Sequence, residues 1–78
     1  MQKYCCDTTE LKKAMADAGL NKIGEVSKKS GINRNTLGKV LSGQELPSSM
    51  VMYGLVEALN LSPTRAGIIF FKPNLRNT

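Results

Sequence analysis

The sequence contains no histidine and no tryptophan, and its two cysteines, Cys5 and Cys6, are neighbours. Without histidine the chain lacks the commonest general base of enzymes, and two cysteines alone do not complete a tetrahedral zinc site. Adjacent cysteines rarely bridge each other because the ring is strained. We therefore expect no enzymatic activity, no metal and no cofactor, and we interpret both cysteines as reduced thiols.

Long hydrophobic runs are also absent from the sequence. No stretch approaches the ~20 apolar residues that a membrane-spanning helix needs, and the N-terminus lacks the layout of a signal peptide. A chain of 78 residues suits one domain with a modest core. These features predict a soluble, cytoplasmic protein with no membrane partner. Its single domain is expected over residues 1–78, with an irregular lead-in at 1–6 and an irregular tail at 73–78.

Acidic residues are scarce, because 11 Lys and Arg face only 6 Asp and Glu, which gives a net charge of +5. The imbalance is concentrated between Lys22 and Gly43, where Glu25 is the only acid. The cations of this segment are Lys22, Lys28, Lys29, Arg34 and Lys39. Such a cluster indicates a nucleic-acid partner, and the alternative is a basic helix face that only meets solvent.

Capping residues and apolar periodicity predict helices at both ends of the chain. Asp7 and Glu10 form an acidic version of the capping box, so a first helix should begin near Thr8 and end at Gly19. Its apolar stripe comprises Leu11, Ala14, Met15 and Ala18. A fourth helix, capped by Ser48 or Ser49 and ended by Asn60, should bury Met52, Leu55, Val56 and Leu59.

A fifth helix should begin at Ser62-Pro63, which combines a capping hydroxyl with proline at the first helical position, and run to about Phe71. The apolar run from Ile68 to Phe71 is also compatible with a short strand, but Pro63 to Gly67 lead into it as a helix. The predicted fold is all-α, with five helices.

The segment between Asn21 and Gly43 holds two further helical patterns, separated by Gly31. In the first pattern one face carries Ile23, Val26, Ser27 and Ser30. In the second, which follows the capping residue Asn33, the inward side carries Leu37, Val40 and Leu41. The outward side is polar and cationic, with Arg34, Asn35, Thr36, Gly38 and Lys39. Two short helices that cross at a small residue and present such a face are typical of a helix-turn-helix.

The order of residue types in this segment resembles the Cro and repressor family of phage and bacterial helix-turn-helix regulators, often called XRE-like. The matching positions are Val26, Ser27, Gly31, Ile32, Asn33, Leu37 and Gly43. The resemblance spans about residues 8–71 and implies a five-helix lambda-repressor-like DNA-binding domain, with the helix-turn-helix in helices 2 and 3. The chain is similar to small prophage regulators of Gram-positive bacteria. It departs from the family at Ile23, where many members have a phosphate-binding Gln, and at Ser27, which is commonly Ala.

The resemblance implies a transcriptional repressor that binds a pseudo-palindromic operator in double-stranded DNA as a homodimer. The residues at the base-reading positions are Arg34, Asn35, Thr36 and Lys39. Phosphate contacts are expected from Lys22, Asn33, Ser42, Gln44 and Ser48. Thr36 is equally compatible with a plain exposed helix position. Gly38 either lets the helix sit deep in the groove or is simply tolerated.

The apolar residues near the C-terminus exceed what one helix face of a small domain can hide. We therefore expect a dimer interface formed by Ile68, Ile69, Phe70 and Phe71. The alternative is that the aromatic pair folds back on the first helix as core.

A protein-interaction module is the alternative function, in which the helix-turn-helix acts mainly by binding a regulatory protein partner, as an antitoxin or anti-repressor partner does. The outward cations Arg34 and Lys39 favour DNA over this alternative.

Overall fold

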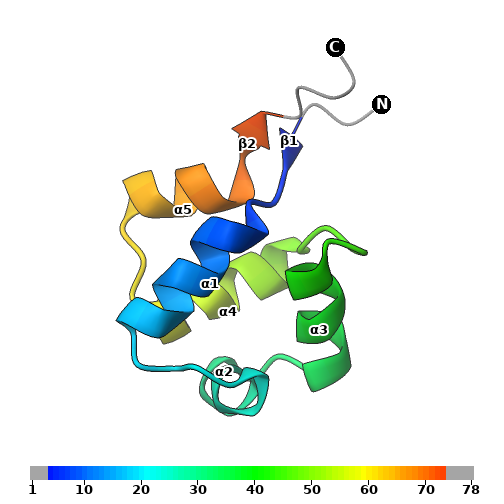
Figure 1. Cartoon of the computed structure of the whole chain (residues 1–78), viewed down its shortest axis with the longest axis vertical. Helices are drawn as coiled ribbons and strands as arrows, with labels where there is room; N and C mark the ends of the chain where they lie inside the picture. The colour runs from blue at the N-terminus through cyan, green and yellow to red at the C-terminus, as the bar shows by residue number, and fades with distance from the viewer. Residues whose placement is uncertain (1–3, 74–78) are drawn as a thin grey trace.

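The computed structural model describes residues 4–73, in which five helices and two short strands follow one another. The elements are β1 (Tyr4–Cys5), α1 (Thr8–Asp17), α2 (Ile23–Ser30), α3 (Arg34–Ser42), α4 (Ser49–Leu59), α5 (Pro63–Phe70) and β2 (Lys72–Pro73). The all-α, five-helix prediction is confirmed (Figure 1). The predicted irregular ends at 1–3 and 74–78 lie outside the described residues.

Side-chain caps fix where the helices begin. The Asp7 carboxylate accepts a hydrogen bond from the Glu10 N–H at 3.1 Å, and the Ser62 hydroxyl accepts one from the Arg65 N–H at 3.1 Å. At α4 the cap is Ser48, whose hydroxyl accepts from the Val51 N–H at 3.3 Å. These bonds satisfy N–H groups of the first turn, which have no partner within the helix.

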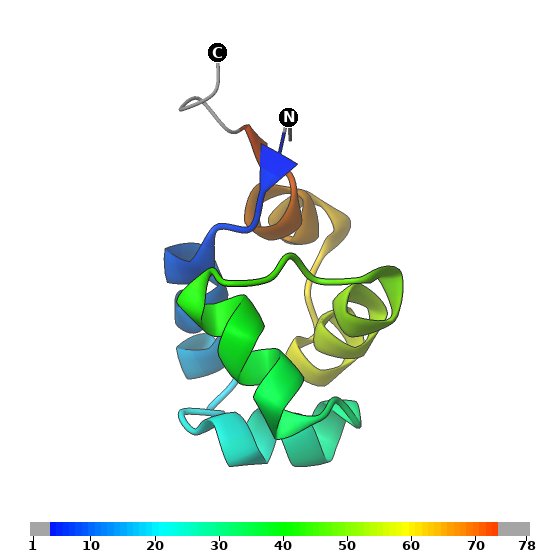
Figure 2. The same ribbon diagram turned by 90° about the vertical axis from the view of Figure 1, so that its right-hand side faces the viewer.

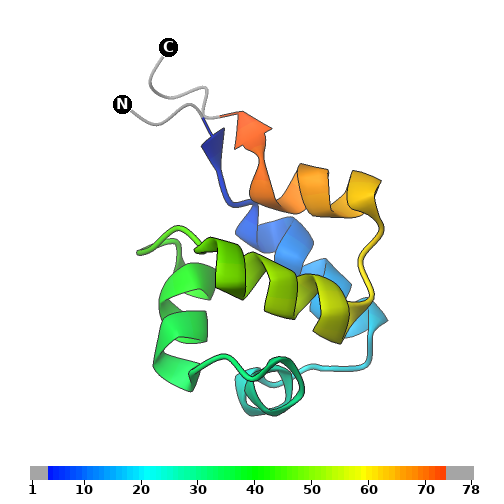
Figure 3. The same ribbon diagram turned by 180° about the vertical axis from the view of Figure 1, so that it is seen from behind.

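All five helices contribute to a single core. Its fully buried side chains are Leu11 of α1, Val26 of α2, Leu37 and Val40 of α3, Leu55 of α4 and Ile69 of α5. In Figure 3, α4 runs across the middle of the molecule, with α5 above it and α2 below it. Figure 2 shows α3 on the surface that faces the viewer. The core therefore supports α3 from behind and leaves its outer side free.

The buried stripes of α1 and α4 differ in part from those predicted. In α4, Val51 is buried and Met52 is only half-buried, because Met52 lines a groove between α4 and α5. In α1, Ala18 is exposed, because it caps the helix beyond the last turn that packs on the core. In the described residues no helix is long and apolar enough to span a membrane.

The two ends of the described chain pair with each other as antiparallel strands, with Tyr4 opposite Pro73 and Cys5 opposite Lys72 (Figure 1). The Asp7 N–H also donates a 2.6 Å hydrogen bond to the Ile69 carbonyl. Irregular structure was predicted over 1–6 and 73–78, so the strands at Tyr4–Cys5 and Lys72–Pro73 were not predicted. The pairing joins the segment before α1 to the segment after α5.

The fold divides the predicted dimer-interface segment into buried and exposed residues. Ile69 is 0% exposed and Phe70 is 6% exposed, because both side chains pack in the core of the same chain. Neither is available to a second chain, so their assignment to an interface is corrected. Ile68 and Phe71 remain about half exposed.

Candidate nucleic-acid interface

The outer side of α3 presents the four predicted base-reading residues. Leu37 and Val40 are buried on the inner side, which leaves Arg34, Asn35 and Lys39 exposed and Thr36 half-buried. Asn33 caps the helix, its side chain accepting a 2.7 Å hydrogen bond from the Asn35 N–H. The helix ends at Gly43, which has a φ of 83° and adopts the left-handed conformation that favours glycine.

The turn between α2 and α3 is held by two serine side chains. The Ser27 hydroxyl donates a hydrogen bond to the Ile32 carbonyl. The Ser30 hydroxyl donates to the Val26 carbonyl at 2.6 Å and accepts from the Ile32 N–H at 3.2 Å. Sequence reasoning treated Ser27 only as a small residue that permits close crossing, and it missed this bond. The sequence did offer a signal for this bond, because Ser27 has a hydroxyl hydrogen-bond donor where many family members have Ala.

Ile23, the residue at the position where many family members have Gln, packs on α3. A Cβ built on Gly38 would lie 3.7 Å from the Ile23 Cδ1 atom, which is ordinary van der Waals contact. The first turn of α2 therefore supports the middle of α3 through an apolar contact. Gly38 faces α2, so its missing side chain does not bear on how deeply the outer face approaches a ligand.

Arg34 lies against the beginning of α2. A Cβ built on Gly24 would be 3.7 Å from the guanidinium carbon of Arg34. This places the Arg34 charge between the outer face of α3 and the N-terminal end of α2, where Lys22 is exposed. The arrangement brings two cations to one edge of the helix-turn-helix.

The predicted phosphate-contacting residues flank α2 and α3. Lys22, Asn33, Ser42, Gln44 and Ser48 are all exposed. Three of these side chains already have hydrogen bonds within the chain: Asn33 and Ser48 cap helices, and the Ser42 hydroxyl donates to the Lys39 carbonyl at 3.1 Å. A cap that accepts one bond still leaves Ser48 a hydroxyl proton to donate.

Glu25 is a residue that sequence reasoning did not place in the site. Its carboxylate accepts a 3.2 Å hydrogen bond from the Lys22 N–H and so caps α2. An acid at this end of α2 opposes an incoming phosphate, so a net positive charge at this end of the helix depends on Lys22 and Arg34. The spacing of Glu25 three residues after Lys22 was the signal available in the sequence.

The cations of the helix-turn-helix are free of ion pairs within the described residues. The ion pairs found there join Lys13 to Glu10, Arg65 to Asp17, and Lys72 to Asp7. All of these pairs lie outside α2 and α3. The positive charge of the segment is therefore available to an anionic partner.

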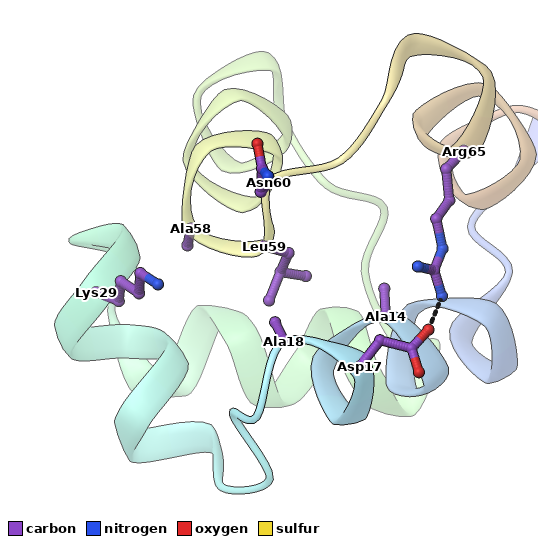
Figure 4. Close-up of a pocket in the computed structure, with 8 residues that line it drawn as sticks. All are labelled: Ala14, Asp17, Ala18, Lys29, Ala58, Leu59, Asn60 and Arg65. Atoms are coloured by element: carbon purple, nitrogen blue, oxygen red, sulfur yellow. Dashed lines mark hydrogen bonds and ion pairs between the residues drawn. The ribbon is translucent and has the colours of Figure 1, made fainter.

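A separate polar pocket of about 310 Å³ lies among the ends of α1, α4 and α5, with Lys29 of α2 in its lining. Figure 4 shows Arg65 reaching across to Asp17, and their 2.6 Å bond joins α5 to α1. Arg65 is already paired, so Lys29 of α2 is the cation of this pocket that has no ion pair within the described residues. Within residues 4–73 there is no cluster of side chains suited to holding a metal ion.

Comparison with known proteins identifies the family. A family model described as Helix-turn-helix matches residues 11–65. The chain belongs to this Cro/repressor-type helix-turn-helix family. The match covers α2 and α3 entirely, so the chain is a DNA-binding transcription regulator by family. No curated protein and no solved structure matches the chain.

Proposed function

We propose that this helix-turn-helix protein is a phage- or prophage-type repressor that binds a pseudo-palindromic operator as a homodimer. The observation that carries the proposal is the outer face of α3, where Arg34, Asn35 and Lys39 are exposed and no acid intervenes. Arginine and lysine donate to guanine O6 and N7, and asparagine pairs with adenine N6 and N7. Repression follows from occlusion of a promoter by the bound dimer.

In the proposed complex the residues have separate roles. Arg34, Asn35, Thr36 and Lys39 approach base edges, while Lys22, Asn33, Ser42, Gln44 and Ser48 approach phosphates. Phosphate contacts position the protein without reading sequence, whereas base contacts select the operator. A variant at a phosphate-contacting residue should therefore weaken binding to all DNA sequences alike, whereas a variant at a base-reading residue should weaken binding mainly to the operator.

Selection of binding sites from randomised duplex DNA at about 150 mM salt tests the proposal. Wild-type protein should enrich a palindrome with half-sites about 34 Å apart, one turn of DNA. Arg34→Ala and Lys39→Ala should each cost about 1–3 kcal/mol at the selected site and relax the preference at one position per half-site. Lys12→Ala, which removes one exposed positive charge from α1, is the matched control and should keep the site preference.

Two outcomes separate this proposal from the alternative. An enriched palindrome that Arg34→Ala relaxes supports an operator-binding repressor. Uniform, salt-sensitive binding with no enriched site, equally weakened by Lys12→Ala and Arg34→Ala, would contradict it. That second outcome would favour a module that acts by binding another protein.

A further inference from the structure

Two glycines lie where α2 and α3 meet, and each faces a side chain of the opposite helix. A Cβ at Gly38 of α3 would lie 3.7 Å from the Cδ1 atom of Ile23 on α2. A Cβ at Gly24 of α2 would lie 3.7 Å from the guanidinium carbon of Arg34 on α3. The first contact is apolar and joins the two helices. The second involves a residue that the proposed function assigns to base edges, so Gly24 is placed where it can affect recognition.

The guanidinium of Arg34 turns its flat face towards Gly24. A Cβ at Gly24 would be 3.7 Å from Cζ, 3.8 Å from Nη2 and 3.9 Å from Nε of Arg34. The carbon is the nearest of the three atoms, although nitrogens surround it in the plane of the group. An approach within that plane would meet a nitrogen first, so Gly24 lies over the face of the guanidinium and not at its edge.

This orientation leaves the hydrogen-bond donors of Arg34 available to a ligand. The N–H groups of a guanidinium point outward in its plane, so contact with its face does not cover them. Within the described residues, Arg34 has no ion-pair partner. The side chain is therefore supported by α2 on one face, while its planar fork of donors has not been used by the fold.

Space for Arg34 is the steric role that the structure gives to Gly24. Its φ is not positive, so the backbone at this position does not require glycine. The three nearest neighbours of an added Cβ all belong to Arg34. Alanine would fit, because its methyl group would be in ordinary van der Waals contact with the guanidinium. The Cγ atoms of valine would extend one bond further and enter the volume that the guanidinium occupies.

A guanidinium held in this way is suited to guanine. Bidentate donation to guanine O6 and N7 requires the plane of the arginine fork to be aligned with the base. A free arginine side chain has many rotamers and loses them on binding, whereas one that is already held in place loses fewer. Support from α2 therefore favours a ligand that needs a fixed plane of donors over one that needs only a positive charge.

We propose that Gly24 is a positioning residue for Arg34, and that Arg34, held flat over the first turn of α2, reads a guanine in each half-site of the operator. The proposal deepens the proposed function and depends on it for the identity of the ligand. It adds a residue of α2 to those that determine specificity, although Gly24 itself makes no contact with a base.

The order of the Arg34 side chain in the free protein provides the first test. The heteronuclear NOE of an arginine Nε–H group reports motion on the picosecond-to-nanosecond timescale. Arg65, whose guanidinium is paired with Asp17 at 2.6 Å, is the internal reference. In wild type and in Gly24→Ala, the NOE of Arg34 should approach that of Arg65. In Gly24→Val it should fall, because the guanidinium is displaced from α2.

A double-mutant cycle on the selected operator provides the second test. Gly24→Val should weaken binding at least about tenfold and relax the preference for guanine at the position that Arg34→Ala also relaxes. In the Arg34→Ala background, Gly24→Val should change the affinity by less than about twofold. Gly67→Val is the matched control, because it changes a helical glycine of α5 where an added Cβ meets no heavy atom within 4 Å. It should leave the site preference unchanged. Circular dichroism and thermal unfolding check that every variant folds.

Three results would overturn the proposal. The first is an Arg34 Nε–H group that is as mobile in wild type as in Gly24→Val. The second is equal weakening by Gly24→Val with and without Arg34, which would mean that valine acts on the fold. The third is weakening of all DNA sequences alike, which would make Arg34 a phosphate contact. Failure of the proposed function is distinguishable from these. If Arg34 is ordered by Gly24 but wild type enriches no DNA site, the proposed function fails and the positioning role of Gly24 stands.

Discussion

Gly54 of α4 lies directly against Ile32, which ends the turn between α2 and α3. A Cβ at Gly54 would be 3.0 Å from the Ile32 Cδ1 atom and 3.2 Å from the Ser30 carbonyl oxygen. The absence of a side chain therefore lets α4 approach the turn of the helix-turn-helix closely. Through this contact α4 supports the turn that leads into α3, although α4 does not belong to the proposed DNA-binding face.

Gly54→Ala should destabilise the protein, because the backbone carbonyl of Ser30 cannot move aside as easily as a side chain does. Overpacking of this kind costs about 1–3 kcal/mol. Gly67→Ala is the matched control: it lies within α5, where an added Cβ meets no heavy atom within 4 Å. It should stabilise the fold by about 0.5–1 kcal/mol. Urea unfolding of both variants checks this, and similar effects of the two would contradict it.

Gly38→Ala should stabilise the protein and leave DNA binding unchanged. The added methyl group would meet the Ile23 side chain at ordinary contact distance, and alanine is favoured over glycine in a helix by about 1 kcal/mol. It would not reach the outer face of α3. Thermal unfolding and titration with the selected operator provide the two measurements. A loss of affinity greater than about tenfold, equivalent to 1.4 kcal/mol, would mean that Gly38 is needed for close approach to DNA.

Ser48→Ala and Ser49→Ala should differ in stability although the two residues are neighbours. The Ser48 hydroxyl accepts a hydrogen bond from the Val51 N–H, and loss of such a cap costs about 1 kcal/mol. Ser49 is the first residue of α4 and makes no cap bond, so its replacement should be nearly neutral. Urea unfolding measures both. Equal destabilisation would show that Ser48 is not the cap in solution.

The thiol of Cys6 should make stability depend on pH above the neutral range. Burial raises the pKa of the Cys6 thiol to about 11, and the neighbouring Asp7 and Cys5 add to the shift. The raised pKa means that the folded state favours the neutral thiol. The contribution of Cys6 to the free energy of unfolding is therefore complete at pH values below the ordinary cysteine pKa. It is lost as the pH rises towards about 11.

Unfolding measurements on wild type and Cys6→Ala between about pH 8 and about pH 11 test this expectation. Wild type should lose more stability than Cys6→Ala over that range. Both proteins contain the same lysines and tyrosines, so the difference between their curves excludes the contribution of these residues. Parallel curves for the two proteins would contradict the assignment. Slow alkylation of Cys6 at pH 8 in the folded protein, compared with fast alkylation in urea, is a second readout.

The positions of the helices were predictable because each carries local signals. Asp7, Asn33 and Ser62 cap the helices that the sequence assigned to them, and Gly31 and Gly43 end α2 and α3 in the left-handed conformation. These signals act within a few residues of the helix end, so they can be read without knowledge of the tertiary fold.

Features that depend on distant contacts were not predictable in the same way. Strands of two residues have no periodicity, so nothing near Tyr4 indicated that it would lie opposite Pro73. In the apolar run from Ile68 to Phe71, hydrophobicity alone did not say which side chains face the core. The packing of α5 on α1 decides that Ile69 is buried while Ile68 is not.

The outer face of α3 was predicted because its inward residues Leu37 and Val40 follow the helical period. The position of the Arg34 guanidinium over Gly24 was not, since it depends on how α2 and α3 cross. The exposure of Met50 and Tyr53 agrees with the predicted stripe of α4, which includes neither residue.

The pairing of β1 with β2 also has a consequence for the order of folding. It closes the longest loop that the described chain contains, and the entropy cost of closing a loop grows with its length. The contacts between α2 and α3 close much shorter loops. We therefore expect the helix-turn-helix to form early and the β1–β2 pair to form last. By the same reasoning the strand pair should be the first part of the structure to open, with faster amide hydrogen exchange than α3.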